Sequence, residues 1–149
     1  QDLFDNNSSM ILISGSRSAP IPNLRGLLQG SSLSPALFNF FVNELLELLN
    51  APDMPKVTTA GVRTNSLAFA DDINLHAFGK ANMQLLLNVA QRWSLKDGME
   101  FAPEKCFVFT NDVDDPLTLL GVPLPARDVI KYLGLNYTVS GIDHGMSPT

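Results

Sequence analysis

The segment 65–78 reads Asn65-Ser-Leu-Ala-Phe-Ala-Asp-Asp-Ile-Asn-Leu-His-Ala-Phe78, and this pattern indicates the fold more strongly than any other stretch. Large apolar residues alternate with smaller or polar ones on both sides of the acidic pair Asp71-Asp72. Such period-two alternation around a polar bend is typical of a β-hairpin. The sequence therefore predicts two short strands with Asp71 and Asp72 at or near the bend.

Two amphipathic helices are predicted, one on each side of this hairpin. The first has Ser34 as its N-cap and Pro35 as its first helical residue, and it stops at residues 50–52. Its apolar face repeats at steps of three and four residues, at Leu37, Phe38, Phe41, Val42, Leu45, Leu46 and Leu49. The second runs from Gly79 to about Lys96, with Gly98 placed for a left-handed cap. Its predicted buried stripe consists of Met83, Leu86, Leu87, Ala90 and Trp93.

The remaining strands are expected as short apolar runs, at residues 10–13, 107–110, 117–120, 129–133 and 135–139. Residues 15–22 are expected to form a turn, and residues 111–115 an acidic turn. The tail from Gly141 shows no pattern. Hairpin-linked strands interspersed with helices favour an α+β fold, with an antiparallel sheet covered by helices on one face.

Length and composition limit the class of protein. A chain of 149 residues with 45% hydrophobic residues has the size of one domain and can bury a core. The net charge of −5 is a mild argument against a nucleic-acid partner. The single cysteine, Cys106, excludes an internal disulfide. No apolar run approaches the roughly 20 residues of a membrane span, and no secretory signal is recognised, so we expect an intracellular location.

The adjacent carboxylates Asp71 and Asp72 have two interpretations. Asp-Asp is a common dipeptide in solvated turns, and such a turn needs no function. Alternatively, two carboxylates about 4 Å apart repel by about 4 kcal/mol at an effective dielectric of 20, and a bound cation relieves that repulsion. Magnesium prefers oxygen ligands and takes one or two carboxylates together with substrate phosphates. The apolar strands on both sides favour the metal-binding interpretation.

A second segment, residues 25–35, is a polar loop with glycines that leads into the first helix. The N-H groups of such a loop can face an anion, and Gly30 permits close approach of a ligand to the backbone. The amide of Gln29 can both donate and accept. A plain loop with a well-capped helix explains the same residues equally well.

Together these segments resemble the reverse transcriptase family, and within it the non-LTR retrotransposon branch. Residues 27–39 resemble the family's Gln-Gly-x-x-Leu-Ser-Pro-x-Leu-Phe-Asn motif, and residues 69–72 its aromatic-Ala-Asp-Asp hairpin. Residues 98–105 resemble the block of Gly and Lys that follows a helix, and residues 131–134 its Tyr-Leu-Gly hairpin. The segment from Gly15 to Pro22 also precedes the Gln-Gly loop as it does in these elements.

The resemblance implies the palm of an RNA-directed DNA polymerase and a set of functional residues. Nucleotidyl transfer would require magnesium, or alternatively manganese, held by Asp71 with Asp72 beside it. The partners would be an RNA template, a DNA primer and deoxynucleoside triphosphates, with no membrane. The remaining implied roles are nucleotide and template binding for Arg25, Gln29 and Gly30, pyrophosphate contact for Lys105, and primer contact for Tyr132, Leu133 and Gly134.

The chain also departs from the family's pattern. The family has another catalytic Asp on an upstream strand, but Asp2 and Asp5 lack its sequence context and lie too close to the Gln-Gly loop. From this we expect the fingers, the thumb and that upstream strand to be missing from residues 1–149. Residues 1–149 are therefore interpreted as a partial reverse transcriptase domain, which we expect not to polymerise in isolation. A Thr or Ser often follows the family's Lys, where this chain has Cys106.

Two alternatives remain open at this stage. The chain could be a catalytically inactive retroelement relic, or a non-enzymatic nucleic-acid-binding module that retains the palm. Other chemistry-bearing residues are interpreted as structural. His76 has no partner in ligand spacing, Cys106 is expected to be a buried or partly buried thiol, and Trp93 is expected in the core.

Overall fold

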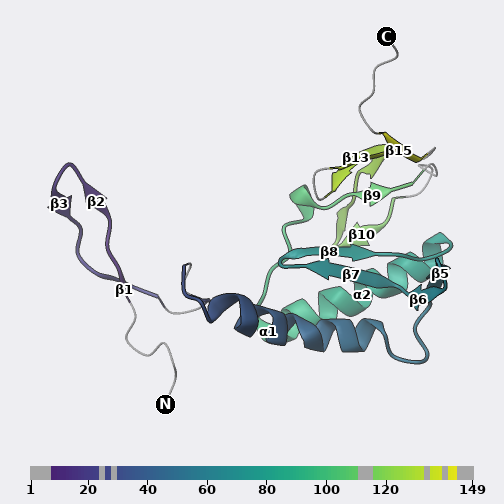
Figure 1. The fold of residues 1–149 in the computed structure, drawn as a ribbon, viewed down its shortest axis with the longest axis horizontal. Coiled ribbons are helices and arrows are strands. Elements are labelled where there is room, and N and C mark those ends of the chain that lie inside the picture. Colours follow the sequence, from purple (N-terminus) through teal and green to yellow (C-terminus); the bar gives the residue numbers. More distant parts are fainter. Residues whose placement is uncertain are drawn as a thin grey trace, which may run out of the picture. The chain divides into compact units, whose positions relative to one another are not determined.

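The computed structural model describes residues 8–23, 26–27, 30–110, 116–132, 135–138 and 141–143, with only the backbone in the last range. The chain divides into two compact units, residues 1–41 and 42–149. Helix α1 (Ser34–Leu49) runs across the boundary between them. Figure 1 shows the fold of both units.

The first unit contains one long hairpin followed by the start of α1. Strand β1 (Ser8–Ser9) pairs with β4 (Ile21–Pro22), and β2 (Leu12–Ile13) pairs with β3 (Ser16–Arg17). The apolar run predicted as a strand at residues 10–13 is therefore strand only at its end. The turn predicted at residues 15–22 is wrong in extent, because it contains two strands whose ladder hydrogen bonds local composition does not reveal.

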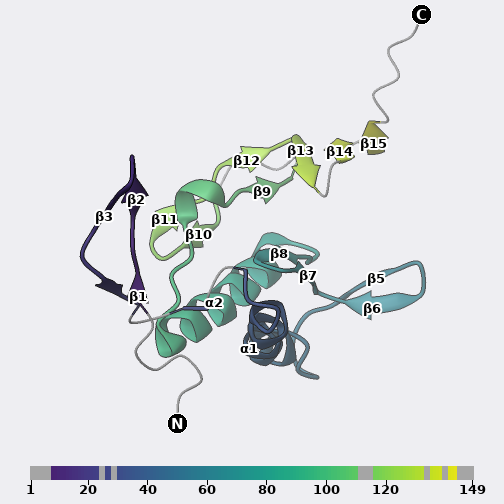
Figure 2. The ribbon, with the colours of Figure 1, turned by 60° about the vertical axis from the view of Figure 1, so that its left-hand side comes forward.

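The second unit contains the hairpin predicted from residues 65–78. It consists of β7 (Ser66–Phe69) and β8 (Asp72–Leu75), paired antiparallel. Helix α2 (Lys80–Asp97) follows and ends at Gly98, whose φ of 66° and ψ of 25° form the predicted left-handed cap. Helix α1 begins at Ser34 itself and ends just before the predicted stop. Both views place α2 and the C-terminal half of α1 on the same side of the β7–β8 hairpin (Figures 1 and 2).

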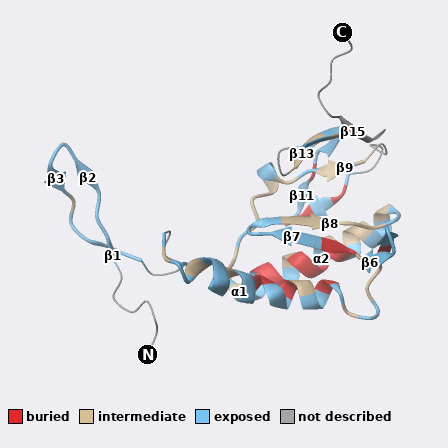
Figure 3. Ribbon diagram, viewed as in Figure 1, coloured by how far each residue is buried: buried red, intermediate tan, exposed pale blue. Residues whose placement is uncertain are grey.

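The core of this unit is formed by the buried side chains of the two helices together with those of nearby strands. Trp93 is 2% exposed, and its ring centroid lies 6.5 Å from that of Phe101. The buried side chains on the helices are Val42, Leu45, Leu49, Leu86, Val89, Ala90, Trp93 and Ser94 (Figure 3). The predicted stripes are thus confirmed in part, since Leu37 is exposed and Met83 and Leu87 are only partly buried. On the surface, Lys96 Nζ lies 2.6 Å from Glu44 Oε1 and links α2 to α1.

Two glutamines of α2 hold the next strands in place. Gln84 Nε2 donates to Thr118 O at 2.9 Å, and Thr118 N donates to Gln84 Oε1 at 3.0 Å. Leu120 N donates to Gln91 Oε1 at 2.8 Å, about two helical turns further on. These three hydrogen bonds connect the hairpin of β10 (Thr118–Leu119) and β11 (Val122–Pro123) to α2. Leu117, Leu119 and Leu124 are buried there.

The C-terminal part adds short strands that the sequence predicts incompletely. After the 3-10 turn η1 (Pro103–Lys105), β9 (Val108–Phe109) pairs in parallel with β12 (Ala126–Arg127). Strands β13 (Val129–Tyr132), β14 (Leu135–Thr138) and β15 (Gly141–Asp143) form a three-stranded antiparallel sheet. The expectation of a patternless tail is wrong for β15, because that strand is defined by its pairing with β14. The acidic turn predicted at residues 111–115 lies outside the described residues.

The described architecture is a mixed α+β fold, as predicted, but not one continuous antiparallel sheet. Its strands form six two-stranded sheets and one three-stranded sheet within the described residues. One hairpin, β5 (Val57–Thr59) with β6 (Val62–Thr64), is not predicted from the sequence. No described helix is long and apolar enough to cross a membrane.

The two helices allow a direct test of this core. Leu86→Ala is expected to lower the free energy of unfolding by about 2–5 kcal/mol, because the side chain is fully buried and its removal leaves a cavity. Leu95→Ala on the same helix is the matched control, since Leu95 is 64% exposed, and it should cost less than about 0.5 kcal/mol. Urea titration monitored by circular dichroism measures both; equal losses would contradict the described packing.

Candidate catalytic site

The acidic pair occupies the tip of the β7–β8 hairpin. Phe69 lies opposite Asp72 in the ladder, so that Ala70 and Asp71 form a two-residue turn between the strands. The predicted position at or near the bend is confirmed, with Asp71 in the turn and Asp72 opening β8. Ala70 has a φ of 51°, a value that glycine adopts far more readily than alanine.

This turn differs from three other two-residue hairpin turns that the structure describes. The turns Ser14-Gly15, Ala60-Gly61 and Leu120-Gly121 each have positive φ at both residues and glycine at the second. That combination is typical of the turns that match the twist of paired strands. At the β7–β8 tip, Asp71 stands in place of glycine and does not have a positive φ. With a positive φ only at its first residue, this turn favours glycine at position 70, where the chain has alanine, and it accommodates aspartate at position 71.

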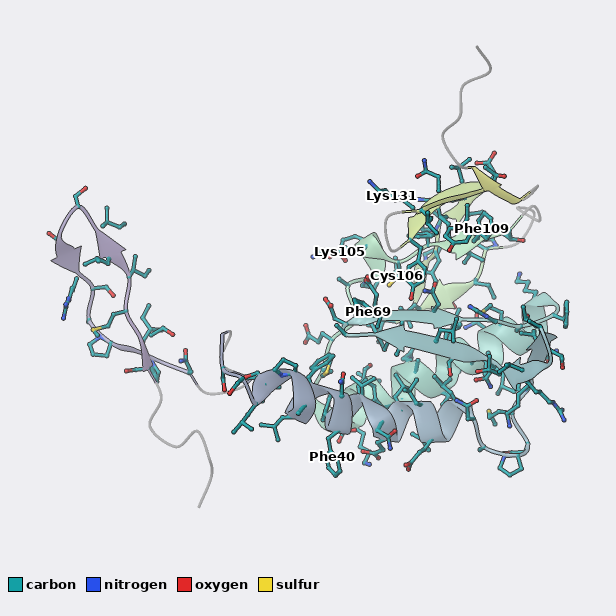
Figure 4. All side chains as sticks on the ribbon, in the orientation of Figure 1. Phe40, Phe69, Lys105, Cys106, Phe109 and Lys131 are labelled. Atoms are coloured by element: carbon teal, nitrogen blue, oxygen red, sulfur yellow. The ribbon has the colours of Figure 1, made fainter. Side chains whose placement is uncertain are left out.

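One face of the hairpin carries both apolar and acidic side chains. The register places Leu67 opposite Asn74 and Phe69 opposite Asp72, so these four residues share a face. Phe69 is 62% exposed and Asp72 is exposed as well. Figure 4 labels Phe69 near the tip of the hairpin. An exposed phenylalanine next to an exposed carboxylate forms a surface that can contact both an apolar ring and a cation.

Asp71 and Asp72 are exposed, and neither side chain forms a hydrogen bond or an ion pair with another described residue. Their oxygen atoms suit a hard divalent cation such as Mg²⁺. No group of three or more His, Cys, Asp or Glu side chains able to hold a metal occurs among the described residues. The pair therefore fits a magnesium site in the chemistry of its donors, but it supplies only two of the ligands. Substrate phosphates, water or further carboxylates would complete the coordination.

Of the predicted nucleotide-binding residues, only Gly30 is described; Arg25 and Gln29 lie outside the described residues. Gly30 has a φ of 90°, and apart from its chain neighbours no heavy atom of the described residues lies within 4 Å of the position that a Cβ would take. The backbone there is open to a ligand. Just after it, Leu33 N donates to Ser31 Oγ at 3.3 Å and Ser34 N to Ser31 O at 3.2 Å, which leads the chain into α1.

Lys105 and Cys106 lie between α2 and β9, as the predicted order of elements requires. Lys105 is exposed at the end of η1, and Figure 4 shows it, like Phe69, at the same end of the second unit in that view. Cys106 is half-buried, as expected. Burial, and in second place the nearby Glu104, raise the pKa of its thiol, which disfavours the nucleophilic thiolate.

Of the predicted primer-contacting residues, Tyr132 is half-buried at the end of β13 and pairs with Leu135. Leu133 and Gly134 lie outside the described residues. A nearby contact is not predicted from the sequence: the guanidinium carbon of Arg127 lies 4.7 Å from the ring centroid of Phe107. The two residues are far apart in sequence, and only the parallel pairing of β9 with β12 brings them together.

The base of the hairpin is closed by His76 and Asn65. His76 N donates to Asn65 O at 2.7 Å, one residue beyond each strand. His76 is half-buried, and burial lowers the pKa of its imidazole from 6.5. Asn65 is fully buried. The sequence shows only that an Asn stands directly before an alternating strand, and it does not reveal the burial. The structural role expected for His76 agrees with this placement.

The fold and the site define a mixed α+β protein that presents an exposed carboxylate pair on a hairpin. The model of the reverse transcriptase (RNA-dependent DNA polymerase) family matches residues 4–137. The chain therefore belongs to the reverse transcriptase family, and the predicted membership is confirmed.

Relatives of the chain come from retrotransposable elements. It is 30% identical over 154 residues to the Retrovirus-related Pol polyprotein from type-2 retrotransposable element R2DM of Drosophila melanogaster, across 95% of this chain and 14% of the relative. It is 29% identical over 144 residues to the Retrovirus-related Pol polyprotein from type-1 retrotransposable element R2 of Popillia japonica, across 89% of this chain and 24% of the relative. The chain thus spans less than a quarter of the length of these curated relatives.

The turn at Ala70 gives a stability prediction. Ala70→Val should lower the free energy of unfolding by about 1 kcal/mol or more, because a β-branched residue adopts positive φ with difficulty. Ala68→Val, an exposed site within β7, is the control and should change stability by less than about 0.5 kcal/mol. Chemical denaturation of both variants tests this; a harmless Ala70→Val would argue against a positive φ at that residue.

The pH dependence of stability should report on His76. Because its pKa is lower in the folded chain than in the unfolded chain, unfolding takes up a proton below pH 6.5. Its contribution is therefore fully present above pH 6.5 and is lost as the pH falls. Between pH 6.5 and about 5, above the range where carboxylates titrate, the wild-type chain should lose more stability than His76→Gln. Identical pH profiles for the two chains would contradict this.

Proposed function

We propose that this chain forms the palm part of an RNA-directed DNA polymerase that copies RNA into DNA. Family membership supports the general activity, and the exposed Asp71-Asp72 hairpin is the observation that carries the proposal for this chain. The mixed α+β fold, with its helices and the β7–β8 hairpin, is compatible with a palm. The substrates would be deoxynucleoside triphosphates, a DNA primer and an RNA template.

In this proposal Asp71 and Asp72 hold divalent magnesium through their carboxylate oxygens. The ions would supply activation of the primer hydroxyl and stabilisation of the departing pyrophosphate. Exposure of both carboxylates supports this role, since a triphosphate can reach them directly. Phe69 shares the face of Asp72 and would contribute an apolar surface beside the reacting groups.

The other predicted site residues would contact the nucleotide, the template and the primer. The open backbone at Gly30, together with Gln29 and Arg25, would bind the incoming nucleotide and the template. Lys105 would contact the pyrophosphate, for which its exposure is favourable. Tyr132, Leu133 and Gly134 would contact the primer. The net charge of −5 implies that these contacts depend on local groups rather than on a general basic surface.

Primer extension on an RNA template tests the proposed role of Asp71. In the protein that carries this chain with its natural flanking sequence, Asp71→Asn should lower the rate at least about a hundredfold. Loss of metal-held charge stabilisation amounts to several kcal/mol, and 1.36 kcal/mol corresponds to a tenfold change in rate. Asp53→Asn is the control, because Asp53 is an exposed carboxylate outside the site, and it should leave the rate unchanged.

Primer extension, together with an RNA-binding measurement, distinguishes the polymerase from a nucleic-acid-binding module and from an inactive retroelement relic. A wild-type protein that extends no primer but binds RNA in a salt-sensitive way without magnesium would favour a binding module. A wild-type protein that does neither would favour an inactive relic. Normal extension by Asp71→Asn would refute the metal-binding role of this residue.

A further inference from the structure

Helix α1 and the acidic hairpin are joined by one buried side chain, that of Asn65. Asn65 is 0% exposed, and its Nδ2 atom donates to Leu49 O at 2.5 Å and to Pro55 O at 2.8 Å. Leu49 is the last residue of α1, where a helix leaves its carbonyl groups without intrahelical partners. A side-chain amide has two N-H donors, and Asn65 uses both on main-chain carbonyls.

Neighbouring residues extend this connection. Asn50 Nδ2 donates to Leu46 O at 2.9 Å and to Ser66 Oγ at 3.1 Å, so that the end of α1 is also tied to the first residue of β7. We call Asn50, Asn65 and Ser66 the helix–hairpin clamp. The backbone of Asn65 also accepts a hydrogen bond from His76 N, beyond the end of β8. The clamp therefore fixes the base of the hairpin from both strands.

The position of the clamp matters for the carboxylates. From Ser66 the strand runs directly to the turn, and a shift of one residue in register would move every side chain to the opposite face. In the described residues the hairpin is a two-stranded sheet, so no further strand fixes its position. Asn65 Oδ1 is buried and has no hydrogen-bond partner among the described residues. The two hydrogen bonds from Nδ2 offset that cost, so the donors are what Asn contributes at this position.

We propose that Asn65 is a positioning residue for the Asp71-Asp72 hairpin: by joining the end of α1 to the base of β7 and β8, it fixes where the two carboxylates stand. This inference rests on the proposed function, in which the carboxylates hold divalent cations. Asn65 itself touches neither substrate nor metal. Asn65 acts on the carboxylates indirectly, because its hydrogen bonds hold the strands β7 and β8 in one register and one position.

The experiment combines Mn²⁺ binding, followed by electron paramagnetic resonance, with amide hydrogen exchange, both on the 149-residue chain well below its unfolding temperature. Asn65→Ala should weaken Mn²⁺ binding at least tenfold. It should also accelerate exchange within residues 66–75 while exchange at residues 86–94 of α2 stays at the wild-type rate. Asn43→Ala is the matched control, because Asn43 is an exposed α1 residue bonded only to Glu47 among the described residues, and it should change neither readout.

Ser66→Ala is the milder variant in case Asn65→Ala does not fold, because it removes only the acceptor of the Asn50 hydrogen bond. It should change both readouts in the same direction by a smaller factor, about threefold for Mn²⁺. Mn²⁺ affinity within twofold of wild type in a folded Asn65→Ala chain would overturn the inference. So would exchange accelerated evenly over hairpin and α2, which marks a purely structural role. A Ser66→Ala chain identical to wild type, where Asn65→Ala does not fold, would overturn it as well.

Asp71→Asn in the same Mn²⁺ titration separates this inference from the proposed function. If Asp71→Asn binds Mn²⁺ as the wild-type chain does, the proposed metal site fails. Hydrogen exchange then decides the placement of the hairpin by Asn65 independently: acceleration confined to residues 66–75 supports it, and any other pattern overturns it.

Discussion

The carboxyl end of helix α1 leaves the main-chain carbonyl of its last residue, Leu49, without an intrahelical partner, and a buried side chain just before β7 satisfies it. Asn65 donates to Leu49 O, Asn50 reaches back to Leu46 O, and Lys56 Nζ donates to the carbonyls of Asn50 and Ala51 at 2.8 and 2.9 Å. An unpaired buried carbonyl is costly, so this helix end is a constraint that each nearby segment must meet. The segment that meets it most directly is the one that becomes β7.

The same constraint explains how an exposed acidic pair is held in a defined place. The tip of the hairpin carries exposed residues and makes few stabilising contacts, whereas its base is buried at Asn65 and Ser66. The buried residues at the base therefore fix the position of the hairpin, while the carboxylates at its tip remain exposed to solvent. This division suits a site that must admit a large charged substrate and still hold its ligands within a narrow range of positions.

Local patterns in the sequence were sufficient for the hairpin, for both helices and for the Gly98 cap, because alternation, apolar spacing and turn chemistry act within a few residues. They failed where structure depends on distant pairing. Strand β15 exists only against β14, and the parallel contact of β9 with β12 joins residues 108 and 126. The acidic pair was found from its context, but the burial of Asn65 depends on carbonyls of Leu49 and Pro55 that no local pattern reveals. The roles of Asp71 and Asp72, and of the other predicted site residues, remain predictions.

The lack of folding contacts at Asp71 and Asp72 has a consequence for how this sequence changes over generations. Folding does not protect either residue, since both are exposed and neither pairs with a described side chain. A substitution at either codon would leave the described packing intact, because it removes no buried contact and no hydrogen bond to a described side chain. Selection to keep aspartate at these two positions would therefore have to act through the proposed metal site, since neither the core nor the described hydrogen bonds require it.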